Sequence, residues 1–335
     1  MRKRTLLCKS TGRLSADFLG LTGVTKFLVT GGAGFIGSNI CKELVSQGCF
    51  VRVVDNLLTG KKSNLASIID KVDFIQADMG DAEVAQSAMK DIDVVLHQGA
   101  LPSVPRSVDD PAATHRHCVN ATFTLLLAAR DAYVKRFVFA ASSSAYGDTP
   151  TLPKVETMTP MPLSPYAAAK LVGEYYCSVF YKVFGLETIS LRYFNVFGPN
   201  QDPASQYAAA IPAFVTAILK DKPPTVYGDG EQSRDFTYID NVVEANLLAA
   251  RAKQTKGEVI NIACGEAVTV NEIIALINEL LGKNIKPIYT DPRPGDVKHS
   301  LADITLAEKL IGYKTKIPFK QGLQLAINWY RENLL

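Results

Sequence analysis

The sequence has little net charge, no closely spaced cysteines and no apolar run that could cross a membrane. Its formal net charge is +3 over 335 residues, too small to favour nucleic acid as a partner. The six cysteines include no C-x-x-C pair, so we expect neither a zinc site nor a disulfide framework. No apolar stretch approaches the roughly 20 residues of a membrane span, and we expect no membrane insertion. Separated, reduced thiols favour a cytoplasmic protein.

Internal repeats, low-complexity segments and flexible linkers are also missing. With 47% hydrophobic and 21% charged residues, the composition is that of an ordinary globular protein. Residues 1–24 include several basic side chains, but the apolar stretch that follows is interrupted by Asp17 and by glycines. Such a segment is a poor secretory signal, and we interpret it as an N-terminal arm of unknown role.

Residues 26–38 have the pattern of a strand, a glycine-rich turn and a helix. The strand is followed by Gly31, Gly34 and Gly37, a G-x-x-G-x-x-G spacing. This order predicts a phosphate site, because the glycines permit a tight turn and the helix N-terminus offers N–H groups. Asp55 ends the next predicted strand, 50–54, where an acid can bind ribose hydroxyls and would repel a 2′-phosphate. An acid there can also be a simple turn or cap residue.

Strand and helix patterns then alternate along the chain. Further strands are predicted at 72–76, 93–97, 137–141 and 187–191, and helices at 119–133 and 165–184. We therefore predict an α/β fold with a doubly wound parallel sheet of Rossmann type, carried by a dinucleotide-binding domain over 25–195. Prolines and tight turns after residue 195 predict a smaller mixed α/β substrate domain over 196–335, from which 259–263 could return to the main sheet.

Tyr166 and Lys170 lie one helical turn apart, after the helix start Ser164-Pro165. A lysine ammonium, together with an oxidised nicotinamide, would favour the phenolate and so lower the tyrosine pKa. The pair alone is a weak motif, since a surface helix can carry it, but its place after the glycine loop favours catalysis. Ser142 and Ser143 end the fifth predicted strand, where a hydroxyl can relay a proton, although a serine run is also an ordinary turn.

Together these motifs resemble the extended short-chain dehydrogenase/reductases, over nearly the whole chain from about residue 25. Segments 192–199, 227–230, 234–236 and 293–296 are similar to those of nucleotide-sugar enzymes, above all UDP-sugar 4-epimerases. Segments 101–107 and 297–300 resemble the bacterial UDP-N-acetylglucosamine 4-epimerases.

The resemblance implies interconversion of UDP-GlcNAc and UDP-GalNAc, with transient hydride transfer from C4 to bound NAD, for surface polysaccharide supply. It assigns catalysis to Tyr166, with Lys170 as its partner and Ser142 or Ser143 as a relay. The implied cofactor-binding residues are Gly31, Gly34, Phe35, Ile36, Gly37, Asp55, Asp78, Met79, Gln98, Ala100, Tyr166 and Lys170. The implied substrate-binding residues are Ser103, Arg106, Ser142, Ser143, Asn195, Tyr227, Arg234, Arg293, Asp296 and Ser300; no metal is implied.

Four positions refine the resemblance. Ser300 matches the position that faces the sugar 2-substituent, and a small residue there resembles enzymes that accept N-acetyl groups; a plain loop serine is the alternative. His97, at a strand end, is interpreted as structural. Gly99 stands where relatives usually have alanine, which could loosen the loop over the nicotinamide. For Arg293, a surface ion pair is the alternative to phosphate binding.

Other functions stay open at this point. Residues 143–145 lack the acid pair of the family's dehydratases, which argues against elimination of water. The alternatives are a 4-epimerase for UDP-glucose/galactose or UDP-uronic acids, a UDP-glucuronate decarboxylase, or a non-catalytic NAD-binding protein. Helices 119–133 and 166–184 correspond to a dimer-forming bundle in relatives, so we expect a homodimer, although Leu125 and Leu126 could be internal core.

Overall fold

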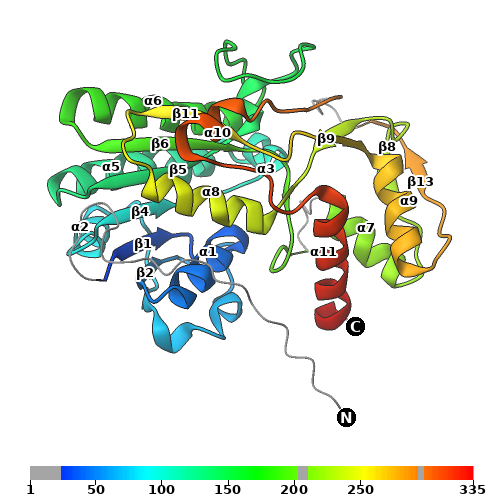
Figure 1. The fold of residues 1–335 in the computed structure, drawn as a ribbon, viewed down its shortest axis with the longest axis horizontal. Helices are drawn as coiled ribbons and strands as arrows, with labels where there is room; N and C mark the ends of the chain where they lie inside the picture. Colours follow the sequence, from blue (N-terminus) through cyan, green and yellow to red (C-terminus); the bar gives the residue numbers. More distant parts are fainter. Residues whose placement is uncertain (1–23, 203–209, 293–297, 335) are drawn as a thin grey trace.

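The centre of the fold is a parallel sheet. The computed structural model describes residues 24–202, 210–292 and 298–334. Its main sheet has seven strands in the order β11-β6-β5-β4-β1-β2-β3, and every pairing in it is parallel (Figure 1). The strands are β1 (Lys26–Thr30), β2 (Phe50–Val54), β3 (Asp73–Ile75), β4 (Val94–His97), β5 (Arg136–Ser142), β6 (Glu187–Tyr193) and β11 (Glu258–Ile262). The predicted α/β fold is confirmed.

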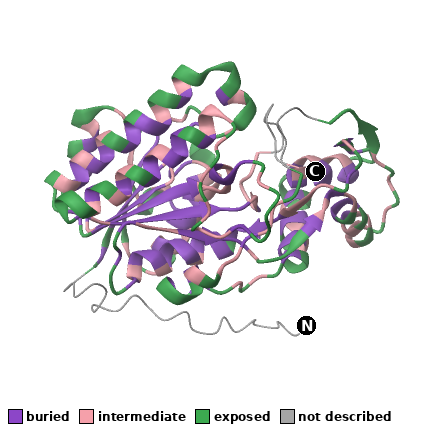
Figure 2. Ribbon diagram, turned by 90° about the horizontal axis from the view of Figure 1, so that it is seen from above, coloured by how far each residue is buried: buried purple, intermediate pink, exposed green. Residues whose placement is uncertain are grey.

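Helices cover both faces of this sheet. They are α1 (Phe35–Ser46) and α8 (Ile239–Arg251) on one face, and α2 (Ala82–Ala88), α5 (Ala121–Asp131) and α6 (Pro165–Phe184) on the other. Because side chains alternate along a strand, Val29 and Val138 pack with the first pair of helices, whereas Leu28 and Phe137 pack with the second group. Figure 2 shows the buried sheet between helices that expose only their outer faces. This double burial explains why the strands are apolar on both sides.

The strand register brings the predicted site to one edge. Thr30 at the end of β1 pairs with Val54 and with His97, the last residues of β2 and β4. The glycine loop, Asp55 and the loop after β4 therefore begin side by side at the carboxyl edge of the sheet, which is where ligands bind in such folds.

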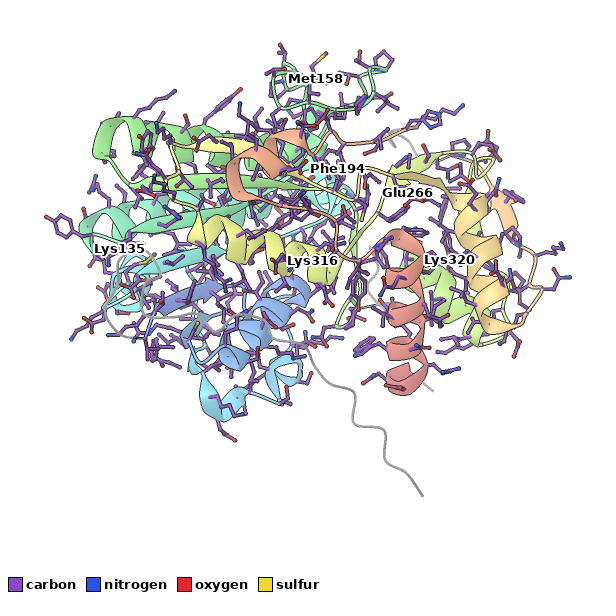
Figure 3. The ribbon with its side chains drawn as sticks, viewed as in Figure 1. Lys135, Met158, Phe194, Glu266, Lys316 and Lys320 are labelled. Atoms are coloured by element: carbon purple, nitrogen blue, oxygen red, sulfur yellow. The ribbon has the colours of Figure 1, made fainter. Side chains whose placement is uncertain are left out.

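The C-terminal part forms a second, smaller layer beside the sheet (Figure 1). It contains α7 (Ala210–Leu219), β8 (Thr225–Tyr227), β9 (Ser233–Asp235), β12 (Ala267–Thr269), α9 (Val270–Leu281), β13 (Ile288–Thr290) and α11 (Phe319–Leu334). Two-stranded sheets join β12 to β9 and β13 to β8. In Figure 3, Phe194 lies between the two layers. The layers are not separate in sequence, because α8 and β11 lie beyond residue 195 and yet build the main sheet layer.

The remaining elements are short. They are β7 (Val196–Phe197), β10 (Thr237–Tyr238), α3 (Val104–Asp109), α4 (Pro111–Thr114), α10 (Thr305–Ile311) and the 3-10 turns η2 (Lys62–Leu65), η3 (Ile69–Lys71) and η5 (Ser143–Tyr146). The predicted helix 119–133 is two pieces, a π-helical segment, η4 (His115–Asn120), followed by α5. Among the described helices, none is both long and apolar enough for a membrane crossing.

Candidate active site

A cavity of about 870 Å³ runs along the carboxyl edge of the sheet. It is lined by most of the residues that the sequence predicted for cofactor and sugar binding. These are Gly31, Gly34, Phe35, Ile36, Gly37, Asp55, Met79, Gln98, Ala100, Ser103, Arg106, Tyr166 and Lys170. Residues up to 139 positions apart in the chain, Gly31 and Lys170, thus share one cavity, as the order of the strands predicts.

The glycine loop is shaped by two close backbone approaches. Gly31 has φ +67°, and a Cβ there would lie 2.6 Å from the Cα of Gly99. A Cβ at Gly37 would collide with the carbonyl oxygen of Gly31. Helix α1 then begins after Gly34, with no side-chain cap and no acid in its first turn. The positive end of this helix is therefore open to an anionic group such as a diphosphate.

Asp55 both holds the loop and faces the cavity. Its buried carboxylate accepts hydrogen bonds from the N–H groups of Ala33 (2.9 Å) and Leu57 (2.8 Å), one on each oxygen. Each carboxylate oxygen can accept a further bond, so ribose hydroxyls can still bind there. The two interpretations of Asp55 from the sequence are compatible, because the turn residue is also a cavity residue.

Asp78 is not among the residues that line the cavity. Its carboxylate accepts bonds from the Gly80 N–H (2.8 Å) and the Asn56 side chain (3.2 Å), and lies 3.5 Å from His117. The neighbouring Met79 does line the cavity. Its side chain occupies the space that a Cβ at Gly99 would need. The Met79 side chain therefore fills the space beside Gly99, and the lack of a Cβ at position 99 leaves no gap in the loop.

Tyr166 and Lys170 are placed by the start of α6. Ser164 caps this helix by accepting a hydrogen bond from the Ala167 N–H (3.1 Å), and Pro165 occupies its first turn. Lys170 is buried, and its Nζ donates to the Ala140 carbonyl (2.7 Å) while lying 6.0 Å from the Tyr166 ring centre. The helix thus delivers both side chains to the end of β5.

The pKa of Tyr166 is raised in the protein alone, and Lys170 by itself does not lower it; the expected lowering by Lys170 together with an oxidised nicotinamide stays a prediction. Burial is the main cause, the Cys118 thiol adds to it, and a hydrogen bond with Ser142 acts in the opposite direction. Burial also lowers the pKa of Lys170. No pattern in the sequence indicated that the Lys170 ammonium would donate a hydrogen bond to the Ala140 carbonyl. Of the two candidate relay serines, Ser142 is the one whose hydroxyl acts on the pKa of Tyr166, and its oxygen also accepts bonds from the N–H (3.2 Å) and hydroxyl (2.8 Å) of Ser144.

A second cavity of about 270 Å³ adjoins the first, since Val196 lines both. Its walls include three predicted substrate residues, Asn195, Tyr227 and Arg234. Two others, Arg293 and Asp296, lie outside the described residues. The two cavities are therefore neighbours, one at the glycine loop and the other at the smaller layer.

Ser300 lies beside strand β9, next to Arg234, and lines neither cavity. Its N–H donates to the Ser233 carbonyl (3.0 Å), and the Ala302 N–H donates to the buried carboxylate of Asp235 (3.2 Å). Burial raises the pKa of Asp235 to about 6, against the effect of its backbone hydrogen bonds. These contacts hold the 300–302 segment against the strand that carries Arg234.

Several cavity residues were not singled out from the sequence. Lys61 and Asp202 form an ion pair (2.6 Å) at the cavity wall, and the Tyr193 hydroxyl donates to Gln98 (3.0 Å). Tyr193 follows the strand-end rule that identified its neighbours, so it could have been found. Lys61 and Asp202 are 141 positions apart, and no pattern in the sequence indicates that they form an ion pair.

Comparisons with known proteins agree with this geometry. Residues 27–263 match the NAD dependent epimerase/dehydratase family. The chain is 39% identical over 308 residues to a putative UDP-glucose 4-epimerase of Methanocaldococcus jannaschii, covering 91% of this chain and 98% of that protein.

Two solved structures are similar to nearly the whole chain. One is a UDP-N-acetylglucosamine 4-epimerase from Methanobrevibacter ruminantium in complex with UDP-N-acetylmuramic acid (TM-score 0.89, 40% identity, 93% of this chain and 99% of that one). The other is a UDP-glucose 4-epimerase from Thermotoga maritima with UDP-glucose (TM-score 0.89, 37% identity, 93% of this chain and 100% of that one).

Proposed function

The chain belongs to the NAD dependent epimerase/dehydratase family, and from this premise we propose that it interconverts UDP-GlcNAc and UDP-GalNAc at C4. The coarser activity, an NAD-dependent nucleotide-sugar 4-epimerase, follows from the family and its relatives. The choice of the acetylated sugar rests on the resemblance, which assigns Ser300 to the position facing the sugar 2-substituent, and on its small side chain; Ser300 lies beside the strand of Arg234 and lines neither cavity. A serine there leaves volume for an acetamide that a large residue would take.

The cavity suits NAD. The open N-terminus of α1 fits its diphosphate, and Asp55 fits the adenosine ribose while disfavouring a 2′-phosphate. When bound, NAD supplies the acceptor and donor of the C4 hydride. The chain's own residues bind it, orient the sugar and move the proton of the 4-hydroxyl.

In this proposal Tyr166 accepts the proton of the sugar 4-hydroxyl and returns it. Because burial raises the pKa of this phenol and Lys170 alone does not offset it, deprotonation needs further positive charge, which an oxidised nicotinamide would add to that of Lys170. Ser142, whose hydroxyl acts on the pKa of Tyr166, bridges the phenol to the sugar hydroxyl as a relay. Asn195, Tyr227 and Arg234 hold the UDP moiety in the adjoining cavity.

The test compares turnover of UDP-GlcNAc and UDP-glucose by purified protein with no cofactor added. We expect a preference for UDP-GlcNAc. The Ser300→Tyr variant should shift the kcat/KM ratio toward UDP-glucose by about 10–200-fold, as expected for steric exclusion of a small group. Thr305→Tyr, at an exposed position five residues on, is the matched control and should keep the wild-type ratio.

Other outcomes separate the alternatives. Equal preference, or an unchanged ratio in Ser300→Tyr, would contradict the selectivity proposal and favour a UDP-glucose/galactose epimerase. No turnover of either sugar, even with NAD added, would favour UDP-uronic acids as substrates. A non-catalytic role is set aside, because the family assignment and the Tyr166–Lys170 pair agree on an enzyme.

We also propose a homodimer. Tyr175, Val179 and Val183 recur every four residues on α6 and are 46–66% exposed, and Phe123 on α5 is 37% exposed. This exposed α6 stripe is the kind of apolar surface that marks a protein interface. Leu125 and Leu126 are buried core residues and take no part in it.

Free cysteines among the described residues fit a cytoplasmic enzyme. We propose that this enzyme supplies sugars for surface polysaccharide.

A further inference from the structure

His97 is buried at the end of β4, behind the cofactor cavity. Its side chain is fully covered, with the rings of Phe137 and Phe139 at 5.7 and 5.6 Å. Each ring nitrogen meets one threonine hydroxyl: Nδ1 lies 2.7 Å from Thr30 and Nε2 lies 2.9 Å from Thr122. The direction of these two bonds follows from counting hydrogens.

On the Nε2 side, the Thr122 hydroxyl donates its only hydrogen to the Cys118 carbonyl (2.6 Å). A carbonyl oxygen can only accept, so the Thr122 oxygen has no hydrogen left for His97. The contact at 2.9 Å is therefore a bond from Nε2–H to Thr122, and Nε2 carries the proton.

On the Nδ1 side, the Thr30 oxygen accepts a bond from the Gly99 N–H (3.3 Å). Within the described residues, Nδ1 is the acceptor that lies within reach of the Thr30 hydrogen. Nδ1 is then unprotonated. Two independent counts thus assign the same tautomer, neutral with the hydrogen on Nε2.

The resulting chain of hydrogen bonds joins two walls of the active site. It runs from the Gly99 N–H through Thr30, His97 and Thr122 to the Cys118 carbonyl. Gly99 lines the cofactor cavity, whereas Cys118 lies in the π-helical segment η4 and packs in one cluster with Tyr166. A π-helical turn is locally unusual and is often found at functional sites.

We propose that His97 is a positioning residue that, as the neutral Nε2–H tautomer, fixes the distance between the cofactor loop after β4 and the π-helical wall behind Tyr166. A protonated ring would also carry a hydrogen on Nδ1. The Thr30 oxygen would then have to accept this bond, and the Thr30 hydroxyl hydrogen would lose Nδ1 as its acceptor. Burial, reinforced by the nearby Lys170, lowers the pKa of His97 to about 3, so the ring stays neutral at working pH. The functional part of this inference rests on the proposed role of Tyr166.

The tautomer is tested by nitrogen NMR of the full chain labelled with ¹⁵N-histidine. The chain has four histidines, and the His97→Gln variant identifies the signals of His97 by their loss. We expect one neutral imidazole with Nε2 protonated, unchanged between about pH 5.5 and 8.5. A ring that titrates in this range, or that carries its proton on Nδ1, would overturn the inference. This measurement needs neither substrate nor a folded Thr122 variant.

The positioning role is tested with Thr122→Val, Thr122→Ser and Thr114→Val. Thr114 is a matched control, because it is a buried threonine on the preceding helix whose hydroxyl has no partner among the described residues. Thr122→Val should lower kcat by about tenfold to a hundredfold with KM for the UDP-sugar little changed, since a small misplacement of reacting groups has effects of this size. Thr122→Ser should restore kcat, and Thr114→Val should match the wild type.

Equal kcat values for Thr122→Val and Thr114→Val would contradict the positioning role. The proposed function fails in a different way: full activity of Tyr166→Phe would remove the role of the tyrosine and leave the nitrogen spectrum of His97 as predicted.

Discussion

At the residue scale, His97 connects the site to the stability of the whole chain. Its pKa is about 3 in the folded protein and about 6.5 in an unfolded chain. Below pH 6.5 the unfolded chain takes up a proton that the folded chain does not. The stabilisation from this residue is thus complete above about pH 6.5 and is lost as the pH falls toward 3.

The expected result is a pH-dependent gap between wild type and His97→Asn. The difference in unfolding free energy between the two should shrink by about 2 kcal/mol from pH 7 to pH 5, as measured by urea unfolding at both values. His115→Asn, at an exposed position, serves as the control for histidine loss and should keep the wild-type dependence. A gap that is constant with pH would mean that His97 has the same pKa in the folded and unfolded chains, which would contradict the lowered pKa.

At the scale of elements, α6 is fixed to β6 by a buried ion pair. Arg192 donates to both carboxylate oxygens of Glu174 (2.9 and 2.7 Å), and both side chains are at most 3% exposed. Glu174 lies one turn after Lys170, so the same face of α6 carries Tyr166, Lys170 and this anchor. The guanidinium also lies 4.5 Å from the Tyr146 ring centre. The anchor therefore contributes to the position of the proposed base.

Breaking this pair should be costly. Glu174→Gln leaves a buried guanidinium without its counter-charge, and we expect a loss of about 3–5 kcal/mol in unfolding free energy. The double variant Glu174→Leu, Arg192→Met should cost less, because neither charge is left alone. Asp73→Asn, which breaks the partly exposed pair with Arg52, is the control and should cost about 1 kcal/mol or less. A loss below 1 kcal/mol in Glu174→Gln would show that the pair does not anchor the helix.

The same elements show what the sequence could predict. The structure has α6 at the predicted bounds 165–184, because Ser164 and Pro165 mark its start and Gly185 its left-handed end. The edge of the sheet where the site lies followed from strand order alone. The π-helical segment was not predicted, because its residues fit an ordinary helix equally well. The choice of Ser142 over Ser143 depends on side-chain direction, and the bonds of Lys170 and Lys61 depend on partners distant in sequence.

At the scale of the whole molecule, the exposed α6 stripe makes the assembly testable. Val183→Glu places a charge at the most exposed valine of the proposed interface and should convert the protein from twice the 36.4 kDa of one chain to a single chain. Light scattering after size exclusion measures this directly. Lys90→Glu introduces the same acid at an exposed position outside α6 and should leave the mass unchanged. A wild type that already elutes as a single chain would contradict the homodimer.

The position of β11 next to β6 has a consequence for the newly made chain. About 65 residues separate the end of β6 from the start of β11. At ribosomal speeds of roughly 5–20 residues per second, roughly 3–13 seconds pass between the emergence of the two strands. Throughout that interval an apolar strand at the border of the sheet has no neighbour on one side, and unpaired edges of this kind invite aggregation. Chaperone protection of this strand is therefore needed while residues 194–258 are being made.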